Sequence, residues 1–356
     1  MITLRIEGKS ADDAAKELFS RILVSGEESL LVRLKGEGAA FAPALVTDKG
    51  IGNRNLVLVP PLLMDNAAVA LSRLLRKETP KTLKKRLVAF LRPCEARAFV
   101  ELTKLKQGSL EPVTLVTFLC DGALSLEQFR KGERPTFLYS GGLLSERNAC
   151  RICLFPVAPF TDVQILLERT SLVLFAQSVK GESLLKRLGG GEEDANFEEK
   201  KRRVTEGKRK AREEFLSQMR ERLKGVKNLR SYLADCVNCH NCMRLCPVCY
   251  CRLCFFESAD MEEPLDHHIA LAERDGLRSI EDEKLLFHLG RLEHMASLCV
   301  GCGVCDDACP NKVGIFGLFA LVSDAVQKLF GYTPGADSSQ PLPMTLYREE
   351  EFTHLG

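Results

Sequence analysis

The fold of the C-terminal part of this chain is decided by residues 236–247, CVNCHNCMRLCP, whose cysteine spacing returns in residues 299–310, CVGCGVCDDACP. Both segments read C-x2-C-x2-C-x3-C-P, the run that holds paired [4Fe–4S] clusters, with the fourth cysteine of each run binding the other cluster. Three closely spaced thiolates can each take one iron corner of the same cube, and the fourth begins a turn toward the neighbouring cube. One cluster should therefore use Cys236, Cys239, Cys242 and Cys309, and the other Cys299, Cys302, Cys305 and Cys246. Zinc is the alternative, but zinc sites typically use two C-x2-C pairs rather than a triplet followed by C-P.

The segment between the two runs is long and helix-patterned, and its middle, 255–298, contains no cysteine. It is unlike the short β-rich link of a small bacterial ferredoxin. It resembles the α-helical ferredoxin domains of succinate dehydrogenase iron–sulfur subunits and of heterodisulfide reductase. We therefore expect a mainly α-helical dicluster ferredoxin-like domain at 231–330.

Three further cysteines, Cys249, Cys251 and Cys254, follow the first run in PVCYCRLCFF. They could supply most of a further metal site, or they could be small buried hydrophobic residues. Three thiols are one ligand short of a complete cluster, so a fourth ligand would have to come from elsewhere in the chain, from a partner or from a group other than cysteine.

The first half of the chain has the pattern of an α/β domain. Residues 11–22 and 94–107 have helical apolar spacing, and short apolar runs lie at 30–34, 56–59, 87–91 and 113–119. The runs RLVAFL and VTLVTFLC have the length and residue types of buried strands. Strand, helix and strand in this order predict an α/β domain at 1–188 with some parallel pairing.

Four cysteines are scattered through this α/β half. Cys94, in RPCEAR, follows a predicted strand and opens a helix, where free backbone N–H groups point outward. Cys120 ends the next strand, and Cys150 and Cys153 form a C-x2-C pair. Two cysteines at strand ends and one pair can converge on a four-iron cube, but separate buried thiols fit the spacing equally well.

The segments RPCEARAFVELTKLKQ, TFLC and CRICLFPVAPFTDV resemble the β-subunit family of deazaflavin-reducing hydrogenase and formate dehydrogenase, over roughly residues 10–180. The resemblance implies that Cys94, Cys120, Cys150 and Cys153 bind one [4Fe–4S] cluster beside FAD. It also implies a catalytic dehydrogenase or hydrogenase subunit as partner. The chain departs from the family where members that reduce the deazaflavin usually carry a Gly-Gly stretch, because the corresponding residues here read VSGEESLLVRL.

Composition excludes several classes of function. The chain has 356 residues and a net charge of +2, so it does not have the charge of a nucleic-acid binder. The N-terminus lacks the basic start and apolar core of a signal peptide, and no run of 18 or more apolar residues indicates a membrane span. We therefore expect a cytoplasmic protein whose cysteines bind metal rather than form disulfides.

Two segments outside the domains have distinctive compositions. The predicted linker, 189–230, becomes strongly charged from 198 to 227, which favours a solvated helix over a helix that docks a partner or an anion. The tail, 331–356, is rich in proline and turn residues at its start, so we expect an extended arm on the surface or on a partner. Gly189–Gly191 lacks the Lys-Ser/Thr of a phosphate loop.

Polar residues near the cysteine runs are further candidates. His240 and His294 could donate a hydrogen bond to a cluster sulfur, although a packing or surface role is the simpler interpretation. His267-His268 fits the surface better than a metal site. Asp306 and Asp307 would lower the potential of a nearby cluster, unless they are solvated carboxylates.

Together these features predict an electron-transfer subunit of an anaerobic oxidoreductase complex, of the formate dehydrogenase or hydrogenase β-subunit type, linked to FAD. A flavin converts two-electron chemistry into one-electron steps, and clusters accept one electron each. The alternative is a flavin-free cluster relay within a heterodisulfide-reductase-like complex. A third reading is a regulatory cluster protein that senses oxygen.

Overall fold

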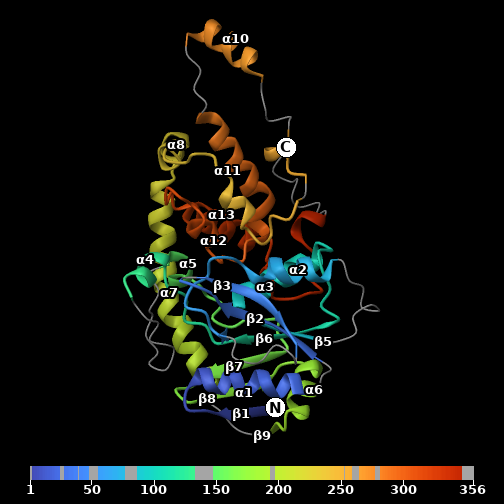
Figure 1. The fold of residues 1–356 in the computed structure, drawn as a ribbon. Coiled ribbons are helices and arrows are strands. Elements are labelled where there is room, and N and C mark those ends of the chain that lie inside the picture. The colour runs from blue at the N-terminus through green and yellow to red at the C-terminus, as the bar shows by residue number, and fades with distance from the viewer. Residues whose placement is uncertain are drawn as a thin grey trace.

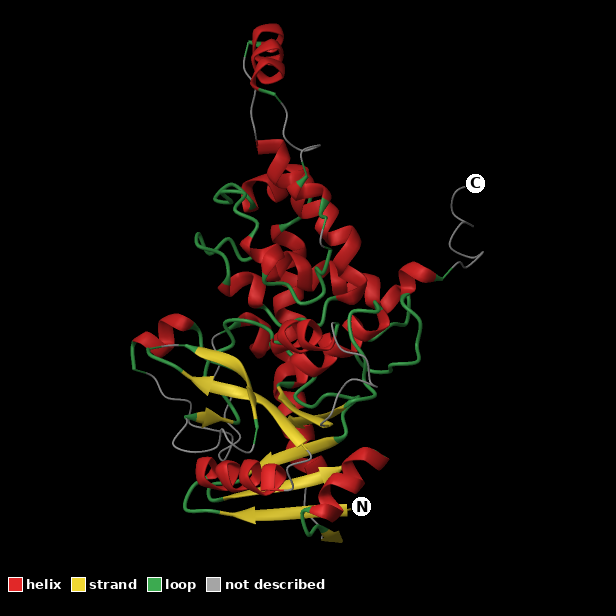
Figure 2. Ribbon diagram, turned by 45° about the vertical axis from the view of Figure 1, so that its right-hand side comes forward, coloured by secondary structure: helices red, strands yellow, loops and turns green. Residues whose placement is uncertain are grey.

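The computed structural model describes residues 2–24, 28–38, 40–47, 55–76, 86–132, 147–192, 197–251, 253–258, 264–276 and 281–346. Within these ranges the chain forms an α/β part that carries the N-terminus and a helical, cysteine-rich part stacked on it (Figure 1). Figure 2 shows the sheet at one end of the molecule and helices at the other. The predicted fold class is therefore confirmed.

One sheet organises the α/β part. Its strands are β1 (Ile2–Glu7), β2 (Glu28–Lys35), β3 (Phe41–Val46), β4 (Leu56–Val57), β5 (Arg86–Leu91), β6 (Val113–Phe118), β7 (Val163–Leu167), β8 (Ser171–Ala176) and β9 (Gly191–Glu192). They follow the order β3-β2-β5-β6-β7-β8-β1-β9, and β4 pairs with β2. The central pairs β2–β5, β5–β6 and β6–β7 are parallel, as predicted, and the flanking pairs are antiparallel. The last strand, β9, lies past the predicted domain end at residue 188 and includes the last glycine of the Gly-rich segment.

Helices cover both faces of this sheet. α1 (Ala11–Val24) and α6 (Val179–Arg187) cover one face, and α2 (Ala67–Leu75) and α3 (Pro93–Lys104) cover the other. The short helices α4 (Leu126–Arg130) and α5 (Asn148–Arg151) lie in the connection from β6 to β7. Successive strand residues point to opposite faces. Val88 and Phe90 of β5 therefore pack in the core with α1 and α6, whereas Leu87 and Ala89 pack with α2 and α3.

The C-terminal part is helical between its cysteine loops. Its elements are α7 (Phe197–Arg222), α8 (Val226–Tyr232), α9 (Asn241–Arg244), η2 (Phe255–Glu257), α10 (Leu265–Asp275), α11 (Glu281–Met295), η4 (Ala296–Leu298), α12 (Val304–Asp307), α13 (Ile315–Leu329) and η5 (Pro343–Thr345). α11 and α13 pack against the cysteine loops in a core of their own. α10 has no buried residue and projects away from the rest of the chain in both views (Figures 1 and 2).

α3 joins the two parts through buried polar contacts. Arg97 donates from Nε to the carbonyl of Pro334 (2.8 Å) and from a terminal nitrogen to that of Val300 (3.0 Å). The Glu101 carboxylate accepts from the Tyr332 hydroxyl and from the Gly335 N–H, both at 2.7 Å. The beginning of the tail is therefore packed against its own chain. The expected extended arm is wrong for residues 332–335, because a buried carboxylate on α3 holds them.

The charged helix α7 contacts both the α/β part and the helical part. Ion pairs such as Lys201–Glu198 lie on the mostly exposed stretch 198–207. Lys208 is only 1% exposed and donates to the carbonyl of Asp121 at 3.0 Å. Further on, Phe215, Leu216 and Met219 pack against α5 and α13. The expectation of a solvated helix therefore holds for 198–207 and fails at Lys208 and on the packed side beyond it.

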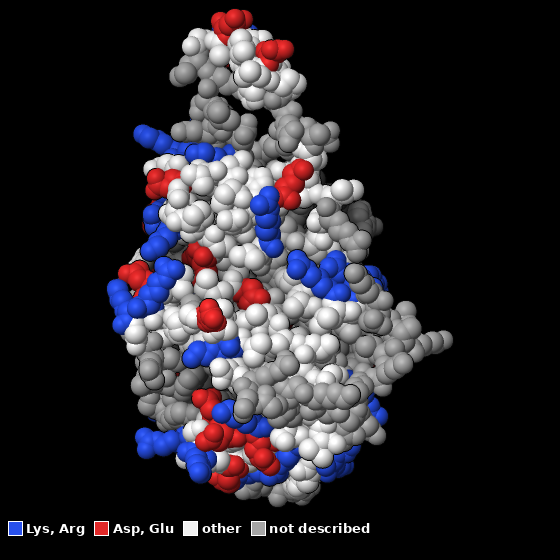
Figure 3. All heavy atoms as spheres, viewed as in Figure 1, with Lys and Arg blue, Asp and Glu red and all other residues white. Residues whose placement is uncertain are grey.

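The surface carries both signs of charge. Figure 3 shows Lys and Arg interspersed with Asp and Glu over the face in view, so neither sign dominates there. None of the helices in the described ranges has the length and apolar character needed to cross a membrane.

Candidate metal centre

The two cysteine loops follow the same backbone path. Asn238 and His240 of the first loop have φ of 51° and 57°, and Gly301 and Gly303 of the second have φ of 72° and 71°. These are the same positions of the two runs, and each loop then leads into a four-residue helix, α9 or α12. The left-handed region disfavours most side chains. Because both loops adopt it at the same two places, the two runs are built to surround the same kind of group.

The first group of thiols, site 1, consists of Cys236, Cys239, Cys242 and Cys309. Cys242 lies close enough to the other three to interact with each electrostatically. Burial raises the pKa of Cys242 to about 11, and the neighbouring thiols add to the rise, while the Arg291 guanidinium opposes it. Arg291 itself donates to the Cys242 sulfur at 3.1 Å. Site 1 thus gathers the four thiols that the spacing assigns to one cluster.

The second group, site 2, consists of Cys246, Cys299, Cys302 and Cys305. Cys246 comes from the first run and interacts with Cys299 and Cys302 of the second, which both interact with Cys305. Burial is the main reason that the pKa of Cys302 rises to about 12. The exchange of one cysteine between the runs is the arrangement of paired four-iron clusters.

The third group, site 3, consists of Cys94, Cys120, Cys150 and Cys153. Cys94 lies in the first turn of α3, directly after β5, and Cys120 follows β6. The carboxyl ends of the parallel strands β5 and β6 meet at one edge of the sheet, where α/β proteins bind their ligands. Cys120 interacts electrostatically with Cys94, Cys150 and Cys153. The structure therefore brings the scattered cysteines together, and separate buried thiols do not describe them.

Glu95 and two arginines hold site 3 in place. Glu95 is buried and accepts from the Arg92 N–H (2.8 Å) and the Ala67 N–H (2.9 Å), which fixes the turn that presents Cys94. Arg92 donates to the Cys120 sulfur at 3.2 Å and Arg147 to the Cys150 sulfur at 3.0 Å. Burial raises the pKa of Cys150, but Arg147, Lys208 and Arg92 outweigh it and the net shift is downward.

Sites 3 and 2 are neighbours. Cys94 and Cys150 of site 3 pack with Cys302 of site 2 around one small apolar core. Arg147 also donates to the Cys302 carbonyl at 3.2 Å. Site 1 also adjoins site 2, because Arg291 interacts with Cys242 of site 1 and with Cys246 and Cys305 of site 2. Site 2 therefore adjoins both of the other sites.

His288, which the sequence did not indicate, lies near a thiol of site 1. His288 on α11 lies with its Nε2 3.5 Å from the Cys236 sulfur. His240 instead stacks on Phe287 with ring centroids 4.1 Å apart, and His294 is exposed. His267 and His268 lie on the projecting α10. His240 and His294 thus follow the packing and surface alternatives.

The two aspartates of the second run are not solvated. Asp306 accepts from the N–H of Phe316 at 2.6 Å, at the start of α13, and burial raises the pKa of this carboxyl to about 6. Asp307 forms an ion pair with Arg147. Both carboxylates hold neighbouring elements in position, and the charge of Asp307 is balanced by Arg147.

The three remaining cysteines lie together beside site 2. Cys249 interacts electrostatically with Cys246, Cys251 and Cys254. Cys249 and Cys254 are half-buried and Cys251 is exposed, so the alternative of small buried hydrophobic residues is wrong for Cys251.

The donor chemistry of sites 1 to 3 fits iron–sulfur clusters. Each site offers four thiols, none in a disulfide. Among the described residues, no three His, Cys, Asp or Glu side chains converge closely enough to share one metal ion. A [4Fe–4S] cluster does not require that convergence, because each thiolate binds a different iron. The arginines Arg92, Arg147 and Arg291, which supply positive charge and hydrogen bonds to thiols, carry no spacing signature and were not predicted for this role.

Comparison with known proteins agrees with this geometry. Residues 232–313 match the family model "4Fe-4S dicluster domain". The chain is similar to the F420-dependent formate dehydrogenase subunit beta of Methanocaldococcus jannaschii, with 22% identity over 72% of this chain and 76% of the relative. It is also similar to the F420-dependent formate dehydrogenase 1 subunit beta of Methanococcus maripaludis, with 23% identity over 70% of this chain and 73% of the relative.

These matches span both the α/β part and the cysteine-rich helical part, in keeping with the resemblance drawn from the sequence. The chain therefore carries a 4Fe-4S dicluster domain in its C-terminal part and is similar, over most of its length, to the β subunits of F420-dependent formate dehydrogenases.

Proposed function

We propose that this chain relays electrons in an anaerobic oxidoreductase complex through [4Fe–4S] clusters at sites 3, 2 and 1, in that spatial order. The observation that carries the proposal is the contact between sites. Cys94 and Cys150 of site 3 share an apolar core with Cys302 of site 2, and Arg291 adjoins thiols of sites 1 and 2. Neighbouring clusters allow one-electron hops, so the order of the sites defines a path from the α/β part to the helical part.

We further propose that FAD binds to the α/β part, at the site 3 end of this path. The related subunits are named F420-dependent, and the family that the sequence resembles reduces a deazaflavin, which is two-electron chemistry. Clusters exchange single electrons, so a flavin is the cofactor that would connect the two kinds of chemistry. Site 3 lies at the carboxyl ends of parallel strands, which is where α/β sheets bind cofactors.

The proposed partner is the catalytic subunit of a formate dehydrogenase or hydrogenase. The relatives are β subunits of formate dehydrogenases, which supports a partner of this type. A cytoplasmic location is part of the same proposal, because all fifteen cysteines are free of disulfides and thiols persist in reducing compartments.

The test is anaerobic purification of the full chain, followed by measurement of iron, acid-labile sulfide and flavin per chain. Sites 1 to 3 require about twelve iron and twelve sulfide, because each cluster holds four of each. Cys120→Ser should lower the iron by about four, whereas Cys309→Ser should remove the cluster of site 1. The matched control is Arg151→Ala, which changes an exposed side chain between Cys150 and Cys153 and should leave the iron unchanged.

The outcomes separate the candidate functions. Full iron in Cys120→Ser would show that site 3 holds no cluster. About eight iron without flavin would leave the flavin-free, two-cluster relay of a heterodisulfide-reductase-like complex. Clusters that do not undergo reversible one-electron reduction at low potential would favour an oxygen sensor instead.

A further inference from the structure

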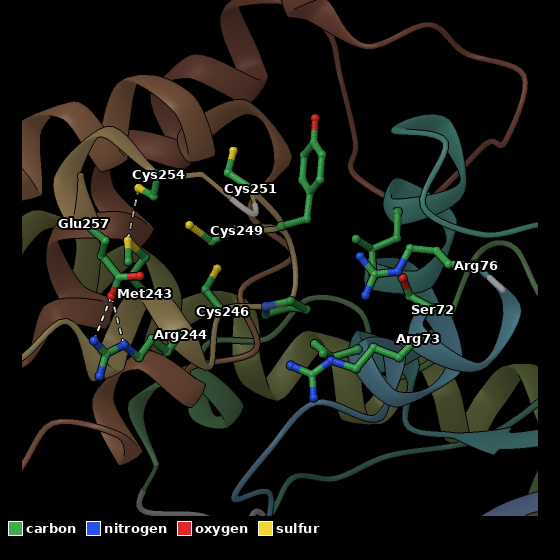
Figure 4. Close-up of a pocket in the computed structure, with 14 residues that line it drawn as sticks. Ser72, Arg73, Arg76, Met243, Arg244, Cys246, Cys249, Cys251, Cys254 and Glu257 are labelled. Atoms are coloured by element: carbon green, nitrogen blue, oxygen red, sulfur yellow. Dashed lines mark hydrogen bonds and ion pairs between the residues drawn. The ribbon is translucent and has the colours of Figure 1, made fainter. Parts of the chain in front are cut away.

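A cavity of about 500 Å³ opens between α2 and the loop that follows site 2. The thiols of Cys249, Cys251 and Cys254, named here the thiol trio, lie on one side of it. Arg73 of α2 and Arg76, which caps the C-terminus of α2, lie on the opposite side and point toward the thiols (Figure 4). The volume is within the range of small-molecule sites, about 300–1,000 Å³. The dicluster family match covers the thiol trio only as part of residues 232–313 and assigns no ligand to this cavity. The proposed relay does not assign one either.

The thiol trio brings three free thiols together at one side of the cavity. Cys249 interacts electrostatically with Cys251 and Cys254, and all three thiols are free. Cys254 also lies 3.7 Å from the Met243 sulfur. The spacing is C-x-C-x2-C, so the three thiols come from one short loop, as three ligands of a cube do in the two long runs. Cys249 in addition adjoins Cys246 of site 2, which places the trio within reach of the proposed relay.

The opposite side of the cavity is basic. Arg73 in the last turn of α2 and its C-cap Arg76, which keeps right-handed helical backbone angles, are three residues apart, so both emerge on the same side of the helix end. Arg76 donates to the Gln107 side chain at 3.3 Å, which orients it. The acidic residue that lines the cavity, Glu257, is already paired with Arg244 at 2.8 Å. Arginine binds carboxylates through two parallel hydrogen bonds, so this side of the cavity suits a carboxylate.

We propose that the thiol trio holds a fourth [4Fe–4S] cluster whose remaining iron carries no cysteine and faces the cavity, where Arg73 and Arg76 hold the carboxylate of a small organic acid bound to that iron. The site goes beyond the three-cluster relay and does not require site 3 or FAD. Its place beside Cys246 makes the cavity a point where a small carboxylate would influence electron exchange with site 2.

The cluster is tested first, with the full chain purified anaerobically. The double variant Cys251→Ser/Cys254→Ser spares Cys249, which adjoins site 2, and should lose about four iron and four sulfide per chain. The matched control is Leu253→Ser, since Leu253 lies between the two cysteines and is 97% exposed. Unchanged iron in the double variant would overturn the proposal, as would the loss of one zinc in place of iron. If the double variant lost iron and also lost the EPR signals of sites 1 and 2, that result would count against a separate fourth site.

A second measurement needs no variant. A cluster iron without a cysteine ligand is released by mild oxidation, which leaves a three-iron cluster with its own EPR signal. The unmutated chain should give this signal from one cluster per chain, and the signal should disappear in Cys251→Ser/Cys254→Ser. The absence of a three-iron signal in the unmutated chain would overturn the proposal that one iron has no cysteine ligand. Sites 1 to 3 have four cysteines each, so the assignment of their clusters is tested independently by Cys120→Ser and Cys309→Ser.

The carboxylate is tested with acetate as the probe. Acetate should change the EPR spectrum of the reduced fourth cluster, and the acetate concentration at half effect should rise about tenfold or more in Arg73→Ala/Arg76→Ala, because charge-assisted hydrogen bonds are lost. Arg130→Ala, which removes an exposed arginine from α4, is the control and should leave that concentration unchanged. No effect of acetate, or the same effect in the double variant, would overturn the assigned ligand class.

Discussion

Gly301 and Gly303 occupy the same loop positions in the second run that Asn238 and His240 occupy in the first. All four residues have positive φ, but their surroundings differ. A Cβ on Gly303 would lie 2.3 Å from the Cβ of Ala149 in α5, whereas a Cβ on Gly301 would meet no atom within 4 Å. Gly303 therefore serves two purposes, since it allows the loop conformation and lets α5 approach site 2.

Gly303→Ala should disturb site 3 as well as site 2, because the new methyl group pushes α5, and with it Cys150, away from the loop. Gly301→Ala is the matched control and should cost only the left-handed backbone strain, about 1–2 kcal/mol. Iron content and thermal unfolding of the two variants measure the difference. If both variants kept the same iron and unfolded together, the close approach of α5 would be irrelevant to site 3.

Arg291 is 3% exposed and donates both to the sulfur and to the carbonyl of Cys242, each at 3.1 Å. Reduction adds negative charge to a cluster, so a buried cation that donates to a ligand sulfur stabilises the reduced form. Arg291→Met should therefore lower the reduction potential of the site 1 cluster, on the order of 50 mV for a one-electron couple if the interaction changes by about 1 kcal/mol.

The measurement is a redox titration followed by EPR. The control is Arg203→Met, which removes an exposed arginine of α7 far along the chain from the loops. An unchanged potential in Arg291→Met, or an equal shift in Arg203→Met, would mean that Arg291 only fills space.

At the scale of residues, the sequence predicted which cysteines lie together better than it predicted which arginines and histidines approach their sulfur atoms. Three of the four ligands at each of sites 1 and 2 lie a few residues apart in one loop, so their spacing is visible in the chain. An arginine or histidine that approaches a sulfur can come from any element. His240 lies between two ligands but stacks on Phe287, whereas His288, 52 residues from Cys236, reaches that sulfur because α11 packs over the loop.

Among the elements, α3 contacts the tail through Arg97, Lys104 and one fully buried carboxylate, Glu101. Glu101 is fully buried and accepts from Tyr332 and Gly335, and Lys104 lies 3.1 Å away. Glu101→Gln replaces one acceptor oxygen by a donor and removes the charge that Lys104 faces. The Gly335 amide should then exchange hydrogen about tenfold faster or more, because a lost charge-assisted hydrogen bond is worth about 1.5–3 kcal/mol.

Hydrogen exchange with mass spectrometry measures this change in residues 331–346. Glu111→Gln, on the exposed loop before β6, is the control and should leave the exchange of that segment unchanged. Equal exchange in Glu101→Gln and the unmutated chain would show that the tail is held by its other contacts, among them the hydrogen bond from Arg97 to Pro334.

The elements were predictable where local sequence determines them. The strands β5 and β6 and the helices α1 and α3 follow from apolar spacing. The packing of α7 did not follow, because three apolar residues, Phe215, Leu216 and Met219, are enough to bury one side of a helix that is charged over most of its length. The tail was predicted to be an extended arm on the surface or on a partner, because proline and glycine mark turns in both exposed and buried segments. Only the contact with Glu101 on α3 shows that the beginning of the tail is a buried segment.

For the whole molecule, the two parts have separate cores and the proposed clusters belong mainly to one of them. The α/β part buries a large apolar core between the sheet and α1 and α6. The core of the helical part is different, since six of the eight thiols of sites 1 and 2 are packed within or against it. The sequence indicated this division correctly, because cysteine runs and apolar strands occupy different halves of the chain. It did not indicate that site 3 lies against site 2, since no spacing relates Cys94 to Cys302.

Removal of the clusters should therefore unfold the helical part while the sheet persists. Where metal ligands line a core, the free energy of metal binding is also free energy of folding, and without clusters the thiols of sites 1 and 2 leave that core unfilled. Oxidative removal of iron in the presence of a chelator should abolish the protection of α11 and α13 in hydrogen exchange, while the amides of β5, β6, β7 and β8 stay protected by the core under α1. Reconstitution with iron and sulfide should restore α11 and α13. If the sheet lost its protection together with the helices, the two parts would unfold as one unit and the contacts of α3 and α7 would outweigh the separation of their cores.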